Sequence, residues 1–323
     1  MITDKKERYI RHCDSETTIP IFSQYWWLDS LCGKGTWDAI LIEDGGEIIA
    51  SFPFYIKKKY LFQGQVMPPL TQNLGVWIKY PTGMNNVDRV GYENRILKQV
   101  ISELPEVDFV NVNLHYMNRN CLPFHWKGFK ESTLYTYIIE GLDDLDDVFN
   151  KFDPKMRNKV RKALKQVETI HTEDIKEFYR INKMTFDRQG IEIPYSYQTL
   201  SYHDKVLKER KARNIFFAVD EKKRVHSALY LTWDKMSSYV HMVGEDPELR
   251  SSGAGIKLIW DAIEFTRNEL KLDKLDFEGS MIESVERVRR NCGGIQYPYS
   301  NIQKSKPLFA IINTIRNILN RST

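Results

Sequence analysis

One short turn combines the residue types that bind a phosphate group. The segment Arg250-Ser-Ser-Gly-Ala-Gly255 places two glycines between a β-rich stretch and a stretch with helical periodicity. Glycines at such a junction let backbone N–H groups gather around an anion, and the helix N-terminus adds partial positive charge. It is not a Walker loop, because no Lys-Ser or Lys-Thr pair follows the second glycine. The spacing therefore predicts a phosphate cradle made of Arg250, Ser251, Ser252, Gly253, Ala254 and Gly255.

A strand and a helix must hold this turn in place. Residues 237–244 form a short, β-rich stretch, which predicts a strand. After the turn, five apolar residues share one helical face, which predicts an amphipathic helix: Ile256, Ile259, Trp260, Ile263 and Leu270. The alternative is a plain strand–turn–helix connection whose glycines serve only tight packing.

The stretch from Ser237 to Leu270 resembles the acyl-CoA signature of the GNAT superfamily of N-acyltransferases. In that family an Arg/Gln-x-x-Gly-x-Gly/Ala turn binds the pyrophosphate of coenzyme A. Asp246-Pro247-Glu248 resembles the tripeptide that often leads into the turn. The resemblance implies that acetyl-CoA or another acyl-CoA is the donor. It also implies that the backbone of His241–Glu245, including Met242 and Val243, pairs with the pantetheine arm and polarises the donor carbonyl.

Composition places the chain among globular proteins. It has 323 residues, of which 42% are hydrophobic and 12% aromatic, enough for two domains with sizeable cores. No apolar run approaches the ~20 residues of a membrane span, and the N-terminus lacks the apolar core of a signal peptide. The four cysteines show no metal-binding or redox spacing. We therefore predict free thiols, no metal site and a cytoplasmic location.

The net charge of +4 is distributed unevenly. Residues 1–140 carry 15 Lys and Arg against 16 Asp and Glu, whereas the remainder carries 32 against 27. The basic excess therefore lies in the half that contains the turn, and an anionic donor or substrate would suit that half. Residues 155–165 hold six basic residues and no acidic one, which predicts a helix whose basic faces are either solvated or phosphate-binding.

Two similar hairpins indicate two domains of one fold. Residues 37–43 and 47–56 flank Asp44-Gly45-Gly46, a strong turn signal, and residues 214–220 and 225–233 repeat the pattern. No Arg-x-x-Gly-x-Gly turn follows the first hairpin. We therefore predict an α/β (mixed α+β) chain of two tandem GNAT-like domains, each a mixed, mostly antiparallel sheet flanked by helices. The predicted parts are a degenerate domain over 1–140, the donor-site domain over 141–305 and an amphipathic helix over 306–323.

This tandem arrangement resembles the Fem-type aminoacyltransferases and their acetyltransferase relatives. The resemblance covers most of residues 150–300 and rests on five motifs: Met156–Ala163, Leu275–Gly279, Glu283–Arg287, Asn291–Gly294 and Tyr297–Tyr299. Fem-type relatives usually take aminoacyl-tRNA as donor, but their donor site does not normally carry so clear an Arg-x-x-Gly-x-Gly turn. The turn therefore favours acyl-CoA, and tRNA is the less favoured partner.

Amine acylation needs a base for the attacking amine and an acid for the leaving group. Glu278 is the first candidate base, because it ends an otherwise apolar strand beside the strand that leads into the turn. The alternative is a structural ion pair with an arginine of the next helix. Many GNAT enzymes place a tyrosine acid in that helix, but residues 281–292 contain none. The further candidates are Glu245 and His241 as reserve bases, and Tyr299 or Tyr297 as the acid.

Two functions from different classes follow from these patterns. The first is an N-acyltransferase that transfers an acyl group, such as acetyl, to an amine of an amino-sugar or of a cell-envelope or polysaccharide precursor. The second is a non-catalytic binding protein that kept the fold, and the intact turn favours the enzyme. The tail after Pro307 has an apolar face, which predicts packing on the protein or on a second copy, with a membrane surface as the alternative.

Overall fold

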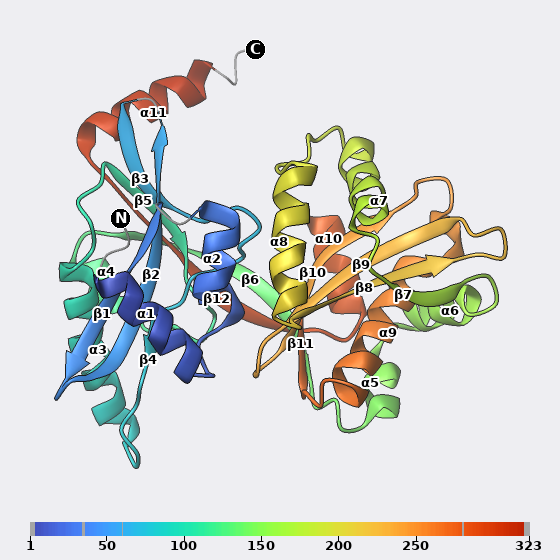
Figure 1. Ribbon diagram of the computed structural model, residues 1–323, viewed down its shortest axis with the longest axis horizontal. Coiled ribbons are helices and arrows are strands. Elements are labelled where there is room, and N and C mark those ends of the chain that lie inside the picture. The colour runs from blue at the N-terminus through green and yellow to red at the C-terminus, as the bar shows by residue number, and fades with distance from the viewer. Residues whose placement is uncertain (1–3, 34–35, 60, 280, 320–323) are drawn as a thin grey trace. The chain divides into compact units, whose positions relative to one another are not determined.

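The computed structural model describes residues 4–33, 36–59, 61–279 and 281–319. The chain folds into two compact units, each of which is described by itself. The first unit comprises residues 1–134 together with 298–323, and the second comprises residues 135–297. In Figure 1 the blue and cyan elements and the red C-terminal helix belong to the first unit, and the yellow and orange elements belong to the second.

The first unit is built on a mixed, mostly antiparallel sheet with strand order β1-β2-β3-β5-β12, and β4 pairs with β2. Neighbouring strands are antiparallel except for the parallel pair β3 and β5. The strands are β1 (Trp37–Asp44), β2 (Glu47–Lys59), β3 (Phe62–Val66), β4 (Trp77–Ile78), β5 (Phe109–Asn113) and β12 (Ile295–Ser305). The helices are α1 (Asp4–Ser15), η1 (Ile21–Ser23), α2 (Tyr25–Cys32), α3 (Asn86–Ser102), α4 (Leu122–Trp126) and α11 (Pro307–Leu319).

The β1–β2 hairpin forms where its glycines predicted it. Gly45 and Gly46 have φ angles of 57° and 85°, which glycine adopts at no steric cost and which match the twist of a tight hairpin. The register shifts once, between Ile42 and Glu43, so that the hairpin carries a bulge beside its turn. The second predicted hairpin, over residues 214–233, is also confirmed.

The second unit contains a sheet with strand order β6-β11-β10-β9-β8-β7. The pair β10 and β11 is parallel, and the other described pairs are antiparallel. The strands are β6 (Lys130–Glu140), β7 (Glu168–Thr172), β8 (Arg213–Val219), β9 (Val225–Trp233), β10 (Ser238–Glu245) and β11 (Lys274–Asp276). The helices are α5 (Leu145–Lys151), α6 (Pro154–Ala163), α7 (Ile175–Arg188), α8 (Tyr197–Glu209), η2 (Arg250–Ser252), α9 (Ala254–Asn268) and α10 (Glu283–Asn291).

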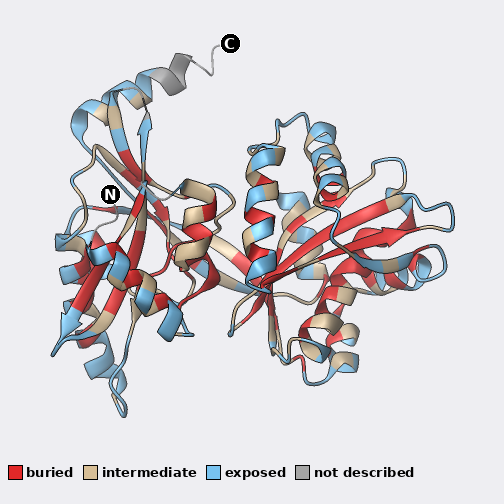
Figure 2. Cartoon of the chain, in the orientation of Figure 1, coloured by how far each residue is buried: buried red, intermediate tan, exposed pale blue. Residues whose placement is uncertain are grey.

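Helices cover both faces of this second sheet. Alternate residues of a strand point to opposite faces. Leu229 and Leu231 of β9 join one apolar core with α6 and α9. Of the predicted stripe after the turn, Ile256, Ile259 and Ile263 are buried in this core, and Trp260 and Leu270 are partly buried against it. Tyr230, which lies between them, faces Phe178 of α7. Figure 2 shows the resulting buried strands at the centre of the unit. The predicted basic helix is α6, and it buries Met156 and Val160 while its lysines stay exposed.

The predicted domain ends, at residues 140 and 305, differ from the observed ends of the units, at residues 134 and 297. Residues 301–305 of β12 pair with residues 109–113 of β5, so that this segment belongs to the first unit. The reason is non-local strand pairing over nearly two hundred residues, which local sequence patterns do not report. The pairing carries Tyr299 into the first unit as well.

Helix α11 forms where the apolar tail predicted a helix. Phe309 stacks on Phe109 of β5, with ring centroids 4.1 Å apart, and so fastens the helix to the first unit. Four aliphatic residues of the helix are nevertheless exposed: Leu308, Ile311, Ile312 and Ile315. The predicted packing on the protein therefore holds for Phe309 and not for this aliphatic row. None of the helices that the structure describes is long and apolar enough to cross a membrane.

Candidate functional site

The two parallel strands of the second sheet part from one another at their C-terminal ends. β10 and β11 pair at Ser238 with Leu275 and at Tyr239 with Asp276. β11 ends at Asp276, whereas β10 continues to Glu245. Where parallel strands separate in this way, side chains and backbone groups at the carboxyl ends become available to a ligand. We call this opening between β10 and β11 the fork.

Glu278 and His241 meet at the fork. The carboxylate oxygens of Glu278 lie 2.9 and 3.1 Å from Nδ1 of His241. The side chains are 9% and 3% exposed, respectively, so this is a buried pair. An ionised carboxylate can only accept a hydrogen bond, so Nδ1 of His241 carries the proton that it donates to Glu278.

Unusual backbone conformations aim both side chains. The β9–β10 register shifts between Val240 and Met242, which makes His241 a bulged residue. Bulges re-aim a side chain and are frequent beside active sites. Glu278 has φ of 57°, in the left-handed region that residues other than glycine rarely adopt. Such strain gathers at functional positions, where the surrounding structure holds it in place.

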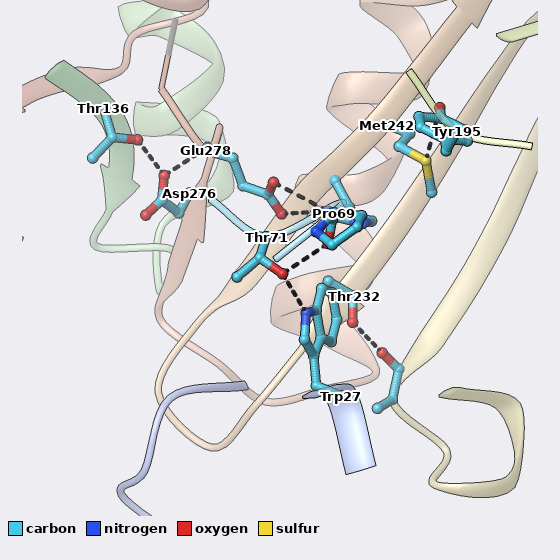
Figure 3. Close-up of polar contacts among 11 residues, drawn as sticks. Trp27, Pro69, Thr71, Thr136, Tyr195, Thr232, Met242, Asp276 and Glu278 are labelled. Carbon is cyan, nitrogen blue, oxygen red and sulfur yellow. Dashed lines mark hydrogen bonds and ion pairs between the residues drawn. The ribbon is translucent and has the colours of Figure 1, made fainter. Parts of the chain in front are cut away.

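The side chain of Asp276 bonds to the backbone of Glu278. Its Oδ1 accepts the backbone N–H of Glu278 at 2.8 Å and the hydroxyl of Thr136 at 2.5 Å (Figure 3). Asp276 is 3% exposed. Burial raises the pKa of Asp276 to about 7, and the neighbouring Glu278 adds to the rise.

The variant Asp276→Asn should remove a pH-dependent loss of stability. The native pKa of Asp276 is about 7, whereas an unfolded aspartate has a pKa near 3.9. The folded state therefore holds the proton more tightly, and this contribution to stability is present below the unfolded pKa and lost as the pH rises through the folded pKa. Asparagine stays neutral and keeps an oxygen for Thr136 and Glu278. Urea unfolding should show an advantage of the variant that grows from about pH 4 to about pH 8; a constant difference would contradict the prediction.

A buried cluster of three polar side chains, Tyr230, Asp204 and Arg213, contacts His241 through the ring of Tyr230. The ring of Tyr230 meets the imidazole edge-on, with centroids 6.1 Å apart. The Tyr230 hydroxyl donates to Oδ1 of Asp204 at 2.9 Å. The guanidinium of Arg213 pairs with both carboxylate oxygens of Asp204, at 2.9 and 3.2 Å. His203 lies beside His241, and burial lowers the pKa of His203 well below its ordinary value. The imidazole of His241 is thus packed against the rings of Tyr230 and His203, and the charges of Asp204 and Arg213 near it are paired.

The predicted phosphate turn forms between β10 and α9. Residues 250–252 make the single turn η2, and Gly253 has φ of 83° at the start of α9. A Cβ on Gly253 would lie 2.8 Å from the backbone oxygen of Lys159, so this glycine also lets α6 pack against the turn. Nζ of Lys162 donates to the backbone oxygen of Ser251 at 2.5 Å. The turn thus has basic residues of α6 beside it.

Glu245 lies against this turn. Its Oε2 is 2.9 Å from Nε of Arg250. A methyl group on Gly255 would collide with Oε1 of Glu245, so the carboxylate lies against the first turn of α9. A carboxylate at a helix N-terminus interacts with the same partial positive charge that holds a phosphate. The carboxylate of Glu245 therefore lies beside the positive charge of Arg250 and the N-terminus of α9.

Helix α7 bonds to the part of β10 that extends beyond its pairing with β11. The side-chain amide of Asn182 donates to the backbone oxygen of Val243 at 2.9 Å, and the hydroxyl of Thr185 accepts the N–H of Glu245 at 2.9 Å. A Cβ on Gly244 would lie 2.6 Å from the backbone of Asn182, so the approach depends on glycine. Two of the backbone groups that the resemblance assigns to the pantetheine arm are thus bonded within the unit. Met242 accepts a hydrogen bond on its sulfur from Tyr195 at 3.3 Å (Figure 3).

The structure brings most of the candidate residues together in the second unit. Glu278 and His241 form one pair, and Glu245 joins the turn instead of that pair. Tyr299 belongs to the first unit, where its hydroxyl is 2.6 Å from the side-chain amide of Gln72. Tyr297 bonds to Glu140. Among the described residues, no group of three or more His, Cys, Asp or Glu side chains could hold a metal ion.

Sequence reasoning missed four residues that shape the site: Thr136, Asn182, Thr185 and Asp276. Asp276 stands two residues before Glu278 in a motif that the resemblance had already singled out, so a second carboxylate in that motif was a usable signal. Thr136, Asn182 and Thr185 come from elements far away in the sequence. No local pattern marks them.

A family model matches the segment of the chain that contains this site. Residues 153–283 match a family model described as an acetyltransferase (GNAT) domain. This segment is therefore similar to a GNAT acetyltransferase domain. It contains the fork, the Glu278–His241 pair and the phosphate turn. A search of curated protein sequences found no match.

Solved structures show the same fold over nearly the whole chain. FemX superimposes with a TM-score of 0.65 at 13% identity, covering 92% of this chain and 96% of FemX. L-PGS from Bacillus licheniformis gives 0.56 at 10% identity, covering 96% of each chain. A conserved protein of unknown function from Bacteroides thetaiotaomicron gives 0.55 at 11% identity, covering 95% of this chain and 100% of that one. The predicted fold, two tandem GNAT-like domains of FemAB type, is therefore confirmed.

Proposed function

We propose that the chain is an N-acyltransferase that transfers an acyl group from acyl-CoA to an amine. The buried Glu278–His241 pair at the fork carries this proposal, because amine acylation needs a proton acceptor beside the reacting carbonyl. The left-handed φ of Glu278 and the bulge at His241 are conformations that occur often at active sites. They therefore favour an enzyme over a non-catalytic binding protein.

The residues of the fork fit the steps of the reaction. The bound donor supplies a thioester carbonyl. Glu278 takes the proton from the attacking amine as the new C–N bond forms and the C–S bond breaks. His241 donates its Nδ1–H to Glu278 and thereby keeps the carboxylate aimed. The leaving thiolate must also be protonated, and no residue is assigned to this step.

The phosphate turn supports acyl-CoA as the donor. Arg250, Gly253 and the N-terminus of α9 offer a charge, a left-handed glycine and a helix dipole to a pyrophosphate. The presence of the Glu245 carboxylate beside Arg250 indicates that this position attracts an anion. Acetyl-CoA is the simplest donor of this class.

A second donor, aminoacyl-tRNA, is favoured by the bonds that α7 makes to β10. Asn182 and Thr185 occupy backbone groups that a pantetheine arm would need. An aminoacyl ester has no such arm. The exposed lysines of α6 beside the turn would suit a phosphate backbone. The similarity to FemX concerns the fold and is compatible with either donor.

A donor competition tests the proposal. The purified full chain is titrated with acetyl-CoA and with charged tRNA at two salt concentrations, and acylation of amino-sugars is followed by mass spectrometry. We expect binding of acetyl-CoA that changes little with salt. Binding of tRNA that falls steeply with salt, without binding of acetyl-CoA, would contradict the acyl-CoA proposal, because tRNA binding releases many counterions.

The acceptor and the setting belong to the same proposal. We infer an amine on an amino-sugar or on a cell-envelope or polysaccharide precursor, acylated in the cytoplasm of a bacterium. The exposed aliphatic row of α11 fits contact with a second copy of the chain or with a membrane surface. Identification of the genes beside this one would narrow the choice of acceptor.

A further inference from the structure

The carboxylate of Glu245 occupies a position that a donor phosphate would need. It pairs with Nε of Arg250 at 2.9 Å, and it lies so close to Gly255 that no side chain could replace the glycine without moving it. Both contacts are with the predicted phosphate turn. A phosphate bound to Arg250 and to the first turn of α9 would meet a like charge at close range, which is unfavourable.

The main chain of Glu245 is held by a hydrogen bond, whereas its side chain makes a partly exposed ion pair. The backbone N–H bonds to Thr185 at 2.9 Å. The side chains of Glu245 and Arg250 are 25% and 46% exposed. Ion pairs with this much exposure contribute little to stability. A ligand that offers Arg250 two phosphate charges can therefore displace the carboxylate without unfolding the strand that carries it.

We propose that Glu245 is a specificity-determining residue for the donor. Its carboxylate competes with donor phosphate for Arg250 and for the N-terminus of α9. Only a donor whose other contacts outweigh this competition remains bound. The inference rests on the proposed function, because it takes the turn to be the phosphate site of the donor.

The variant Glu245→Gln tests the competition. Glutamine keeps the shape of the side chain and removes its charge. Isothermal titration with coenzyme A should show about tenfold tighter binding to the variant than to the wild-type chain, since a like charge at the helix N-terminus is gone. Inorganic pyrophosphate should show a similar gain, because the effect acts on phosphate and not on the pantetheine arm.

Glu248→Gln is the matched control. Glu248 is an exposed acidic residue of the same loop, so its removal changes the net charge equally. The affinity of this variant for coenzyme A should stay within about twofold of wild type, because exposed charges are screened. Unchanged or weaker binding of coenzyme A to Glu245→Gln, a gain for coenzyme A without one for pyrophosphate, or an equal gain in Glu248→Gln would each overturn the inference.

Failure of the inference and failure of the proposed function can be told apart. Tighter binding to Glu245→Gln, with no acylation of any amine by either form, would uphold the inference about Glu245 and contradict the enzyme. Acylation from acetyl-CoA by wild type, with equal coenzyme A affinity in Glu245→Gln, would uphold the enzyme and overturn the role of Glu245.

Discussion

Replacing Glu278 with glutamine should lower kcat by about 10²–10⁴-fold, the usual contribution of a general base. Glutamine fills the same space and can still bond to Nδ1 of His241, so the fork should keep its geometry. It cannot accept the proton of the attacking amine. Because a base acts in the transition state, the affinity for the donor should stay near that of wild type. Steady-state kinetics with acetyl-CoA and calorimetry on the same preparation would measure both quantities.

Glu283→Gln provides the control for this loss. Glu283 is the first residue of α10, its side chain is 85% exposed, and its partner Arg287 is also exposed. Its replacement should leave kcat unchanged. Equal activity of Glu278→Gln and wild type across the pH range would move the base elsewhere. Glu245, the reserve candidate from the sequence, would then be examined first.

His241 should affect kcat through Glu278 and not independently of it. If the imidazole only aims and stabilises the carboxylate, then Glu278→Gln and the double variant Glu278→Gln/His241→Gln should have similar kcat values. The single variant His241→Gln should lose less than Glu278→Gln. Additive losses would show that His241 handles a proton of its own. This double-mutant cycle separates a positioning residue from a second base.

Local patterns predicted the elements of this site well. The Asp44-Gly45-Gly46 turn, the apolar stripe of α9 and the glycines of the phosphate turn each act over a few residues, and each formed as expected. Hairpin turns and helix faces depend on neighbouring residues, so a single sequence contains enough information to predict them.

Contacts between distant elements were harder to predict. Glu278 meets His241 only because a bulge in β10 and a left-handed residue after β11 turn the two side chains toward each other. Neither feature has a reliable signal, since both residues could also occur in ordinary strands. The carboxylate of Glu245 pairs with Arg250, five residues later in the chain. The backbone position of Glu245 depends on its bond to Thr185 of α7. Tyr299 was grouped with the second unit because its partner strand β5 lies far away in the sequence.

Replacing Arg213 with methionine should destabilise the chain by about 3–5 kcal/mol, the usual cost of removing one partner from a buried ion pair. The side chains of Arg213 and Asp204 are 3% and 8% exposed. Without the guanidinium, the carboxylate of Asp204 stays buried, and it keeps the hydrogen bond from the Tyr230 hydroxyl. Urea unfolding at neutral pH measures the loss. Arg180→Met is the control, because Arg180 pairs with Glu177 on an exposed face of α7 and should cost less than about 1 kcal/mol.

The pH dependence identifies the cause of this loss. Burial raises the pKa of Asp204, and loss of Arg213, which favours the charged form, should raise it further. Protonation removes the unpaired charge, so the destabilisation by Arg213→Met should shrink as the pH falls. Arg213→Met/Asp204→Asn should recover most of the stability, because asparagine carries no charge and still accepts from Tyr230. A double variant as unstable as Arg213→Met at every pH would mean that lost packing of the arginine, and not the buried charge, sets the cost. Since Tyr230 packs against His241, kcat of the double variant would show how far this buried group supports the fork.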